Sequence, residues 1–159
     1  MVCSAEWDKI MKKQRICLVG LGYVGLPLAV AFAEKFQVIG FDISSIRIQE
    51  LEDGHDITLE IEDDLLASVK NNITYTTDIQ DTENCNIYIV TVPTPIDKAN
   101  RPDLTPLVES SKTIGTVLGK DDIVIYESTV YPGVTEDVCV PELEKSSGMK
   151  FNKDFYCGY

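Results

Sequence analysis

Histidine is nearly absent from this sequence, in which His55 is the only one among 159 residues. Metal sites and acid–base relays often use histidine, because neutral imidazole binds metals and titrates near neutral pH. We therefore exclude chemistry built on several histidines and predict no metal site. His55 stands between Gly54 and Asp56, where we expect a solvated loop residue; contact with a partner subunit is the alternative.

Paired cysteines are lacking as well, because the five cysteines are odd in number and scattered, with no Cys-x-x-Cys pair. This pattern gives little support for a disulfide framework or a zinc site. We expect reduced thiols in a cytoplasmic protein, with Cys17 and Cys157 as packing residues of strands. The full set is Cys3, Cys17, Cys85, Cys139 and Cys157.

Positive charge is scarce: 14 lysines and arginines stand against 26 aspartates and glutamates, for a net charge of −12. Nucleic acids and anionic membranes select basic surfaces, so we expect no nucleic-acid partner and no membrane partner. An anionic small ligand is not excluded, because backbone N–H groups can bind phosphate whatever the overall charge.

An uncharged stretch at residues 16–33 follows Lys12, Lys13 and Arg15 and imitates a signal peptide. It is also about long enough to span a membrane. Three glycines and Pro27 interrupt it, however, and a strand with an acidic end follows. We interpret it as a buried strand, a tight turn and a buried helix.

Strand and helix patterns alternate along the chain. Strands are expected at residues 15–19, 37–42, 73–76, 86–92 and 122–126, and a last one begins at residues 155–159. Helices are expected at residues 22–35, 44–52, 62–71 and 107–118 and within 133–146. This alternation predicts an α/β fold of the Rossmann type, a doubly wound, mainly parallel sheet with helices on both faces.

The domain division that we expect is simple. Residues 1–13 read as a short amphipathic lead-in, and residues 14–159 as one dinucleotide-binding domain. The chain stops inside an apparent strand, so we expect a fragment of a longer enzyme.

A glycine motif follows the first strand directly: Gly20-Leu21-Gly22-Tyr23-Val24-Gly25. This G-x-G-x-x-G lies where a dinucleotide fingerprint requires it, between a buried strand and a helix. Gly20 would make the tight turn, Gly22 would let the backbone approach a pyrophosphate, and Gly25 would let helix and strand pack closely. A helix–strand crossing that needs small residues and binds nothing is the alternative.

Asp42 ends the second strand, about 20 residues after Gly22, where dinucleotide-binding domains carry an acidic residue. A carboxylate there accepts hydrogen bonds from the adenosine ribose and repels a 2′-phosphate, so NAD is favoured over NADP. Arg47 follows about one helical turn later. It could reach the adenine ribose or a phosphate, or it could be an ordinary surface arginine of a helix.

Two further segments follow strands, at the edge of a parallel sheet where ligands bind. Thr91-Val92-Pro93-Thr94 could border the nicotinamide ribose. Ser128 and Thr129 carry hydroxyls that could hold a water or a substrate oxygen. Their alternative role is capping, since serine and threonine are common at strand-to-helix turns.

The motifs ICLVGLGYVGLPLA, GFDISSIRIQEL, VTVPTP and ESTVYPG stand in this order along the chain. From about Ile16 to the last residue, the chain resembles the UDP-glucose/GDP-mannose dehydrogenase family. GYVGLPLA and the STV-x-PG segment are more specific than a glycine motif alone. GHDITLEIEDDLL, YESTVYPGVTED and the terminal FYCGY are similar to the branch that acts on UDP-N-acetylhexosamines, which includes the enzyme for the Vi-antigen sugar precursor.

This resemblance implies an enzyme that oxidises the C6 hydroxyl of a UDP-sugar to a carboxylate in two steps and reduces two NAD. A cysteine thiolate would capture the intermediate aldehyde, and water would hydrolyse the resulting thioester. Thr129 matches the family threonine that helps to hold this water. The NAD-binding residues that the resemblance implies are Gly20, Leu21, Gly22, Tyr23, Val24, Gly25, Asp42, Arg47, Thr91, Val92, Pro93, Thr94, Ser128 and Thr129.

The rest of the catalytic machinery is expected outside this chain. The family's catalytic cysteine, lysine and asparagine belong to later domains, and its water-holding glutamate to an S-P-E-R type motif that should follow Tyr159. No cysteine here matches the nucleophile, so the chain should bind NAD without turning over substrate. The sugar would be bound mainly by the later domains, and the complete enzyme would be a homodimer or larger.

Two alternatives stay open. One is the cofactor domain of another dehydrogenase, of the hydroxyacid or 6-phosphogluconate type; ESTVYPG and the lack of an arginine directly after Asp42 count against it. The other is an NAD-sensing domain without catalysis, against which the ending inside an apparent strand counts.

Overall fold

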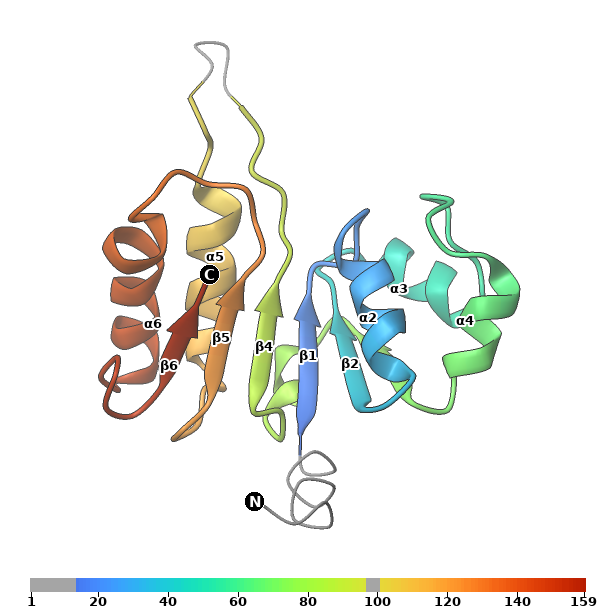
Figure 1. The fold of residues 1–159 in the computed structure, drawn as a ribbon, viewed down its shortest axis with the longest axis horizontal. Coiled ribbons are helices and arrows are strands. Elements are labelled where there is room, and N and C mark those ends of the chain that lie inside the picture. The colour runs from blue at the N-terminus through green and yellow to red at the C-terminus, as the bar shows by residue number, and fades with distance from the viewer. Residues whose placement is uncertain (1–13, 97–100) are drawn as a thin grey trace, which may run out of the picture.

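The computed structural model describes residues 14–96 and 101–159, and the lead-in predicted for residues 1–13 lies outside them. A six-stranded sheet of order β3-β2-β1-β4-β5-β6 forms its centre, and all the pairings are parallel. Figure 1 shows the strand arrows pointing the same way. This order is that of the Rossmann fold, so the predicted fold class is confirmed. The strands are β1 (Arg15–Val19), β2 (Gln37–Phe41), β3 (Ile73–Thr76), β4 (Ile87–Val90), β5 (Ile123–Tyr126) and β6 (Tyr156–Gly158).

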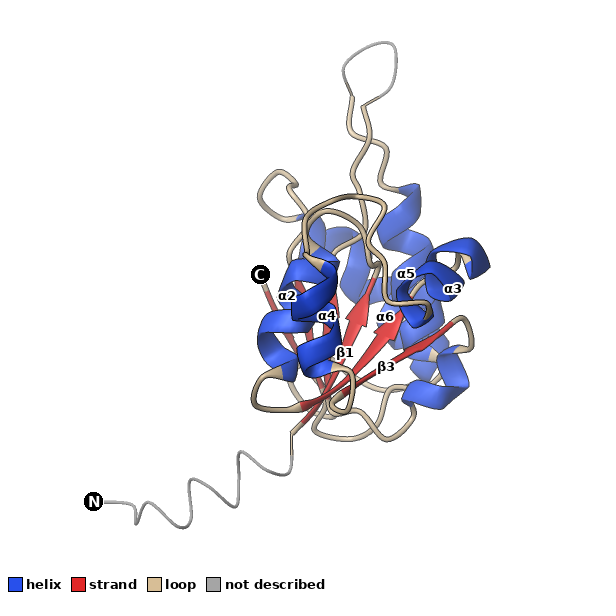
Figure 2. Cartoon of the chain, turned by 90° about the vertical axis from the view of Figure 1, so that its right-hand side faces the viewer, coloured by secondary structure: helices blue, strands red, loops and turns tan. Residues whose placement is uncertain are grey.

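Helices cover both faces of the sheet (Figures 1 and 2). One face carries α2 (Gly25–Ala33), α3 (Ser45–Glu52) and α4 (Asp63–Val69). The other carries α5 (Thr105–Gly115) and α6 (Val140–Ser147). The sheet is therefore doubly wound, and its core is divided into two apolar layers.

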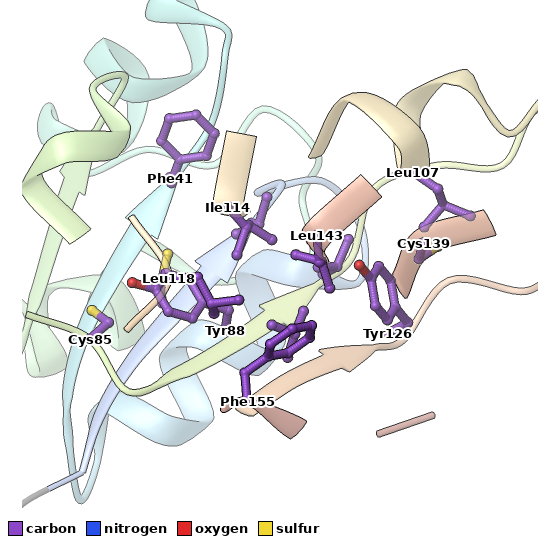
Figure 3. Packing of buried hydrophobic residues seen from close by; sticks show 14 of the residues in the cluster. Phe41, Cys85, Tyr88, Leu107, Ile114, Leu118, Tyr126, Cys139, Leu143 and Phe155 are labelled. Atoms are coloured by element: carbon purple, nitrogen blue, oxygen red, sulfur yellow. The ribbon is translucent and has the colours of Figure 1, made fainter. Parts of the chain in front are cut away.

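The two layers follow from the alternation of side chains along a strand. In β1, Ile16 and Leu18 belong to the layer under α2, whereas Cys17 and Val19 belong to the layer under α5 and α6. Figure 3 shows the second layer from close by. It contains Phe41, Cys85, Tyr88, Leu107, Ile114, Leu118, Tyr126, Cys139, Leu143 and Phe155. A strand with both faces buried is apolar throughout, as the sequence of β1 is.

Helix boundaries differ from the prediction by a few residues. The first helix begins at Gly25 rather than at residue 22, because residues 22–24 belong to the turn that leaves β1. Helix α5 begins two residues earlier than predicted, at Thr105. Pro106 is tolerated there because the first turn of a helix needs no N–H donor.

One short turn escaped the sequence-based prediction. A 3-10 turn at Ile79–Thr82 is capped by Asp78, whose side chain accepts from the Gln80 N–H. A π-helical turn at Thr135–Cys139 lies within the helical region predicted for residues 133–146 and leads into α6, after which Gly148 has φ 72°. The 3-10 turn is too short to show a hydrophobic period, so the sequence did not reveal it.

Candidate cofactor site

Two adjoining cavities lie at the carboxyl ends of the strands, where a Rossmann fold binds its ligand. They share Gly20, Asp42, Val92 and Pro93. The first has a volume of about 340 Å³ and extends between the end of β2 and helix α5. The second has a volume of about 540 Å³ and extends from the glycine loop to the segment after β5. A single elongated ligand could therefore extend through both cavities.

Most of the residues predicted to bind the cofactor meet in the second cavity. It is lined by Gly20, Gly22, Tyr23, Val24, Asp42, Thr91, Val92, Pro93, Thr94, Glu127, Ser128 and Thr129. Of the predicted residues, Leu21, Gly25 and Arg47 do not line it. Leu21 is fully buried and packs its side chain into the layer under α2.

Gly20 and Gly25 shape the glycine loop through the close approach of backbone. Gly20 has φ 95°, a conformation that L side chains rarely adopt, and its N–H donates to the Phe41 carbonyl at 2.9 Å. A Cβ on Gly25 would lie 1.8 Å from the Gly20 carbonyl oxygen and 2.5 Å from Oγ1 of Thr91. The start of α2 can therefore reach the end of β1 only with glycine at this position.

Gly22 differs, because a Cβ there would meet no atom within 4 Å. The packing of the chain itself does not require glycine at this position, yet Gly22 lines the second cavity. Its missing side chain leaves open space for a ligand beside the loop.

The N-terminus of α2 faces the same cavity through Tyr23 and Val24. Its cap residue, Val24, makes no side-chain capping bond, and its first turn carries no acidic residue. A helix N-terminus presents unpaired N–H groups and partial positive charge, which suit an anion such as a pyrophosphate.

Asp42 joins the glycine loop to the second strand. Its Oδ2 accepts from the Leu21 N–H at 2.8 Å, and its Oδ1 accepts from the Ser44 N–H at 2.9 Å. Each carboxylate oxygen has two acceptor sites, so both can also accept from a ligand hydroxyl. Since Asp42 lines both cavities, its carboxylate stands at their junction.

Arg47 is not a surface residue, so that alternative is wrong. It is only 7% exposed, and its Nε donates to the Leu21 carbonyl at 2.8 Å. One terminal nitrogen, Nη1, contacts Glu50 at 2.6 Å and Asp56 at 2.8 Å. Its partner Asp56 lies on the loop after α3, and this contact is not revealed by the place of Arg47 on the helix. Its predicted contact with NAD stays a prediction.

Asp56 holds this loop together. Burial opposes its ionisation, but hydrogen bonds from Thr58, Arg47 and the Ile61 N–H outweigh this and lower the pKa of Asp56 to about 2. His55, beside it, is exposed and pairs with Asp63 at 2.9 Å, as expected of a solvated loop residue.

Hydroxyl groups fasten the segments after β4 and β5. Thr91 donates to the Gly20 carbonyl at 2.7 Å, and Ser128 donates to the Val92 carbonyl at 2.6 Å. The capping alternative is therefore wrong for Ser128, whose hydroxyl bridges two loops. Thr94 donates to the Thr129 carbonyl at 3.0 Å, and the Thr129 side chain is exposed beside the cavity.

The first cavity is mostly lined by residues that the sequence did not single out. They are Phe41, Ile43, Pro106, Glu109, Ser110 and Thr113, besides Val19 and the four shared residues. Helix α5, far along the chain from the glycine loop, supplies Pro106, Glu109, Ser110 and Thr113. No motif marks them, because this wall forms only when α5 packs beside the end of β2.

The cysteines of the described residues are packing residues, as predicted for Cys17 and Cys157. Burial raises the pKa of Cys17 well above its usual value, that of Cys85 to about 11 and that of Cys157 to about 12. These thiols stay protonated at neutral pH and are poor nucleophiles.

Neither a metal site nor a membrane span is found within residues 14–96 and 101–159. No group of three or more His, Cys, Asp and Glu side chains is placed to hold a metal ion there. None of the helices in these ranges is long and apolar enough to cross a membrane.

A glycine loop that leaves space for a ligand, an uncapped helix N-terminus and a carboxylate at the end of β2 meet at one edge of a parallel sheet. The fold and this site define a dinucleotide-binding Rossmann domain. Residues 14–159 match the family described as UDP-glucose/GDP-mannose dehydrogenase family, NAD binding domain, and the chain belongs to this family. This match decides against the hydroxyacid and 6-phosphogluconate types, and the cofactor is NAD.

The relatives include UDP-N-acetyl-D-glucosamine 6-dehydrogenases of two bacteria. The chain is 58% identical over 149 residues to the enzyme of Pseudomonas aeruginosa, and the match covers 94% of this chain and 35% of the relative. It is 54% identical over 145 residues to that of Salmonella typhi, covering 91% of this chain and 34% of the relative. The chain thus spans about a third of the length of these relatives.

Among solved structures, a ternary complex of GDP-mannose dehydrogenase from Pseudomonas aeruginosa superposes with a TM-score of 0.86 at 30% identity. The superposition covers 91% of this chain and 35% of that one. The sheet order and the placement of helices described above are therefore those of a nucleotide-sugar dehydrogenase.

Proposed function

We propose that this chain is the cofactor domain of a UDP-N-acetylhexosamine 6-dehydrogenase, which oxidises the C6 hydroxyl of the sugar to a carboxylate and reduces two NAD. The observation that carries the proposal is the 58% identity over 149 residues to the UDP-N-acetyl-D-glucosamine 6-dehydrogenase of Pseudomonas aeruginosa. The glycine loop, Asp42 and the ESTVYPG segment all fall within the matched family domain, residues 14–159.

In this proposal each part of the site has one task. The N–H groups at the start of α2 hold the pyrophosphate, beside the space that Gly22 leaves. Asp42 accepts from the adenosine ribose and repels a 2′-phosphate. The apolar walls of the first cavity receive the adenine. NAD, when bound, supplies the hydride acceptor, and Thr91, Thr94 and Ser128 keep the loops around it in place.

Thr129 is proposed to position the water that completes the oxidation. Its side chain is exposed at the second cavity, and its carbonyl is fixed by the Thr94 hydroxyl at 3.0 Å. A hydroxyl on an anchored backbone can orient a water for attack. We therefore expect Thr129→Ala in the complete enzyme to lower kcat more than it changes the KM for NAD.

The remaining parts of the proposal concern the complete protein. Residues outside this chain would contribute the nucleophilic cysteine and most contacts to the sugar, and the enzyme would be a homodimer or larger in the cytoplasm. The coverage of about a third of each relative leaves room for such residues. The raised pKa values of the Cys17, Cys85 and Cys157 thiols support the search for the nucleophile elsewhere.

The test is to read the encoding gene beyond Tyr159, express the complete protein, and follow NADH formation with a panel of nucleotide sugars. We expect a UDP-N-acetylhexosamine to be preferred over UDP-glucose and GDP-mannose, with two NADH formed per sugar oxidised. A preference for UDP-glucose or GDP-mannose would contradict the substrate class. NAD binding without turnover, in a protein that lacks a later cysteine, would favour the NAD-sensing alternative instead.

A further inference from the structure

A buried ion pair lies beneath the glycine loop. Nη1 of Arg47 contacts Oδ1 of Asp56 at 2.8 Å, and their side chains are 8% and 0% exposed. Glu50, on the same helix as Arg47, adds a second carboxylate at 2.6 Å. Buried charges are costly to desolvate, and apolar residues of similar size often serve stability equally well, so this cluster suggests a role beyond stability.

Arg47 links this cluster to the loop that faces the pyrophosphate. Its Nε donates to the Leu21 carbonyl at 2.8 Å, while the Leu21 N–H donates to Asp42 at 2.8 Å. Leu21, between Gly20 and Gly22, is thus held on both sides: its N–H is bound by Asp42, and its carbonyl is bound by Arg47. Movement of Arg47 would therefore move the loop.

Asp56 is the rigid end of this link. Besides Arg47, its carboxylate accepts from the Thr58 N–H at 3.0 Å and the Thr58 hydroxyl at 2.6 Å. It also accepts from the N–H groups of Glu60 at 2.9 Å and Ile61 at 3.0 Å. Nη2 of Arg47 has no hydrogen-bond partner in the part of the chain that is described. Its guanidinium is therefore oriented by Leu21, Glu50 and Asp56.

Glu50 alone would not give the same orientation. It lies three residues after Arg47 on α3 and binds the guanidinium at the same nitrogen as Asp56. It also accepts from the Ile57 N–H, next to Asp56. Without Asp56, the only carboxylate left on the guanidinium would be that of Glu50, on the same helix, and the bond from Nε to the Leu21 carbonyl would lose its support from the later loop.

We propose that Asp56 is a positioning residue of the cofactor site, which acts through Arg47 to fix the Leu21 carbonyl and with it the pyrophosphate-binding loop. This inference rests on the proposed NAD site but concerns residues that line neither cavity. A loop that is fixed before binding loses less conformational entropy when the pyrophosphate binds. Loss of Asp56 should therefore weaken ligands that carry the pyrophosphate.

The experiment is a double-mutant cycle on the full 159-residue chain, with Asp56→Asn, Arg47→Met and the double variant, and with NAD affinity measured by calorimetry. We expect Asp56→Asn to weaken NAD binding about tenfold in the native background, and less than about twofold when Arg47 is already methionine. Equal losses in both backgrounds would overturn the inference, because Asp56 would then act without Arg47.

The matched control is Asp63→Asn, the same chemical change at the start of α4, just after this loop. Asp63 pairs with His55 at the surface, with side chains 60% and 69% exposed. The Asp63→Asn variant should therefore bind NAD as tightly as the native chain. Ligand fragments separate positioning from a general loss of structure. Asp56→Asn should weaken ADP-ribose but not adenosine, whereas equal weakening of both would contradict a role at the pyrophosphate.

Both carboxylate oxygens of Asp56 accept from N–H or O–H donors, so the NH₂ group of an asparagine would face donors in either orientation. A second variant therefore covers the case in which Asp56→Asn does not fold. Arg47→Lys keeps a positive charge beside Asp56 but loses the planar group that reaches Leu21 and Asp56 together. We expect several-fold weaker NAD binding at nearly native thermal stability. Native NAD affinity in Arg47→Lys would overturn the inference, whereas a native chain that binds no NAD would overturn the proposed function instead.

Discussion

Two alanine substitutions in the glycine loop should have opposite effects on stability and on binding. Gly22 and Gly25 both belong to the fingerprint, and neither is among the residues with positive φ. The backbone conformation therefore allows alanine at both positions. The surroundings differ: a Cβ at Gly25 would lie 1.8 Å from the Gly20 carbonyl oxygen, whereas a Cβ at Gly22 meets nothing within 4 Å.

The magnitudes follow from these contacts. At Gly25 the obstacle is backbone, which cannot rotate away, so we expect the upper end of overpacking costs, about 3 kcal/mol of unfolding free energy. For a domain of this size that lowers the melting temperature by roughly 6–12 °C. At Gly22 we expect less than about 0.5 kcal/mol. The methyl group would instead occupy space in the second cavity and weaken NAD about 100-fold or more, equivalent to about 2.7 kcal/mol.

The assay combines thermal unfolding by circular dichroism with calorimetric titration of NAD, on both variants and the native chain. The expected result is a destabilised Gly25→Ala variant, and a stable Gly22→Ala variant that binds NAD poorly. If Gly22→Ala bound NAD as tightly as the native chain, the pyrophosphate could not lie beside this residue. If Gly25→Ala were as stable as the native chain, the close approach of α2 to β1 would be refuted.

Three further predictions concern pH, thiols and packing. The pKa of Asp56 is lowered to about 2 from 3.8, so the ionised carboxylate contributes about 2 kcal/mol of stability, which is complete above about pH 4 and is lost as the pH falls through 2. When the unfolding free energy is measured at falling pH, the Asp56→Asn variant should therefore lose less stability than the native chain. Equal losses in the two chains would contradict this role of the carboxylate. In a Cys3→Ser variant the other thiols, buried or half-buried, should react with a thiol reagent only slowly until denaturant is added. Rapid reaction of this variant in its folded state would contradict their burial. Tyr126→Phe removes the 2.7 Å hydrogen bond to Ser111 and should lower the free energy of unfolding by about 1 kcal/mol. The loss is no larger because the Ser111 hydroxyl can still donate to the Leu107 carbonyl. An unchanged melting temperature would show that this bond adds no net stability.

The sequence predicted much of the fold because the signals were local. The strand at residues 73–76 was predicted with its observed bounds, and the helix expected at residues 44–52 begins at Ser45, capped by the Ser44 side chain, which accepts from the Arg47 N–H. An apolar run, a capping residue and a glycine with φ 85° at position 54 act within a few residues of themselves. The start of α2 was misplaced because Gly22, Tyr23 and Val24 continue an apolar pattern while they form the turn.

The site was predictable only in part, for a similar reason. The fingerprint, Asp42 and the segments after β4 and β5 are local motifs, and the structure brings most of them to one cavity. The burial of Arg47 depends on Asp56, which lies on a later loop, and the wall of the first cavity depends on α5. Neither contact leaves a pattern in the sequence, because the partners are set by tertiary packing.

The cofactor assignment is tested most directly by titrating the chain with NAD and with NADP in a calorimeter, alongside Asp42→Ala. Asp42 stands at the junction of the two cavities and accepts from the Leu21 N–H at 2.8 Å. We expect the native chain to bind NAD more tightly than NADP, and the variant to lose much of this preference. Tighter binding of NADP by the native chain, or an unchanged preference in Asp42→Ala, would contradict the role given to the carboxylate at the end of β2.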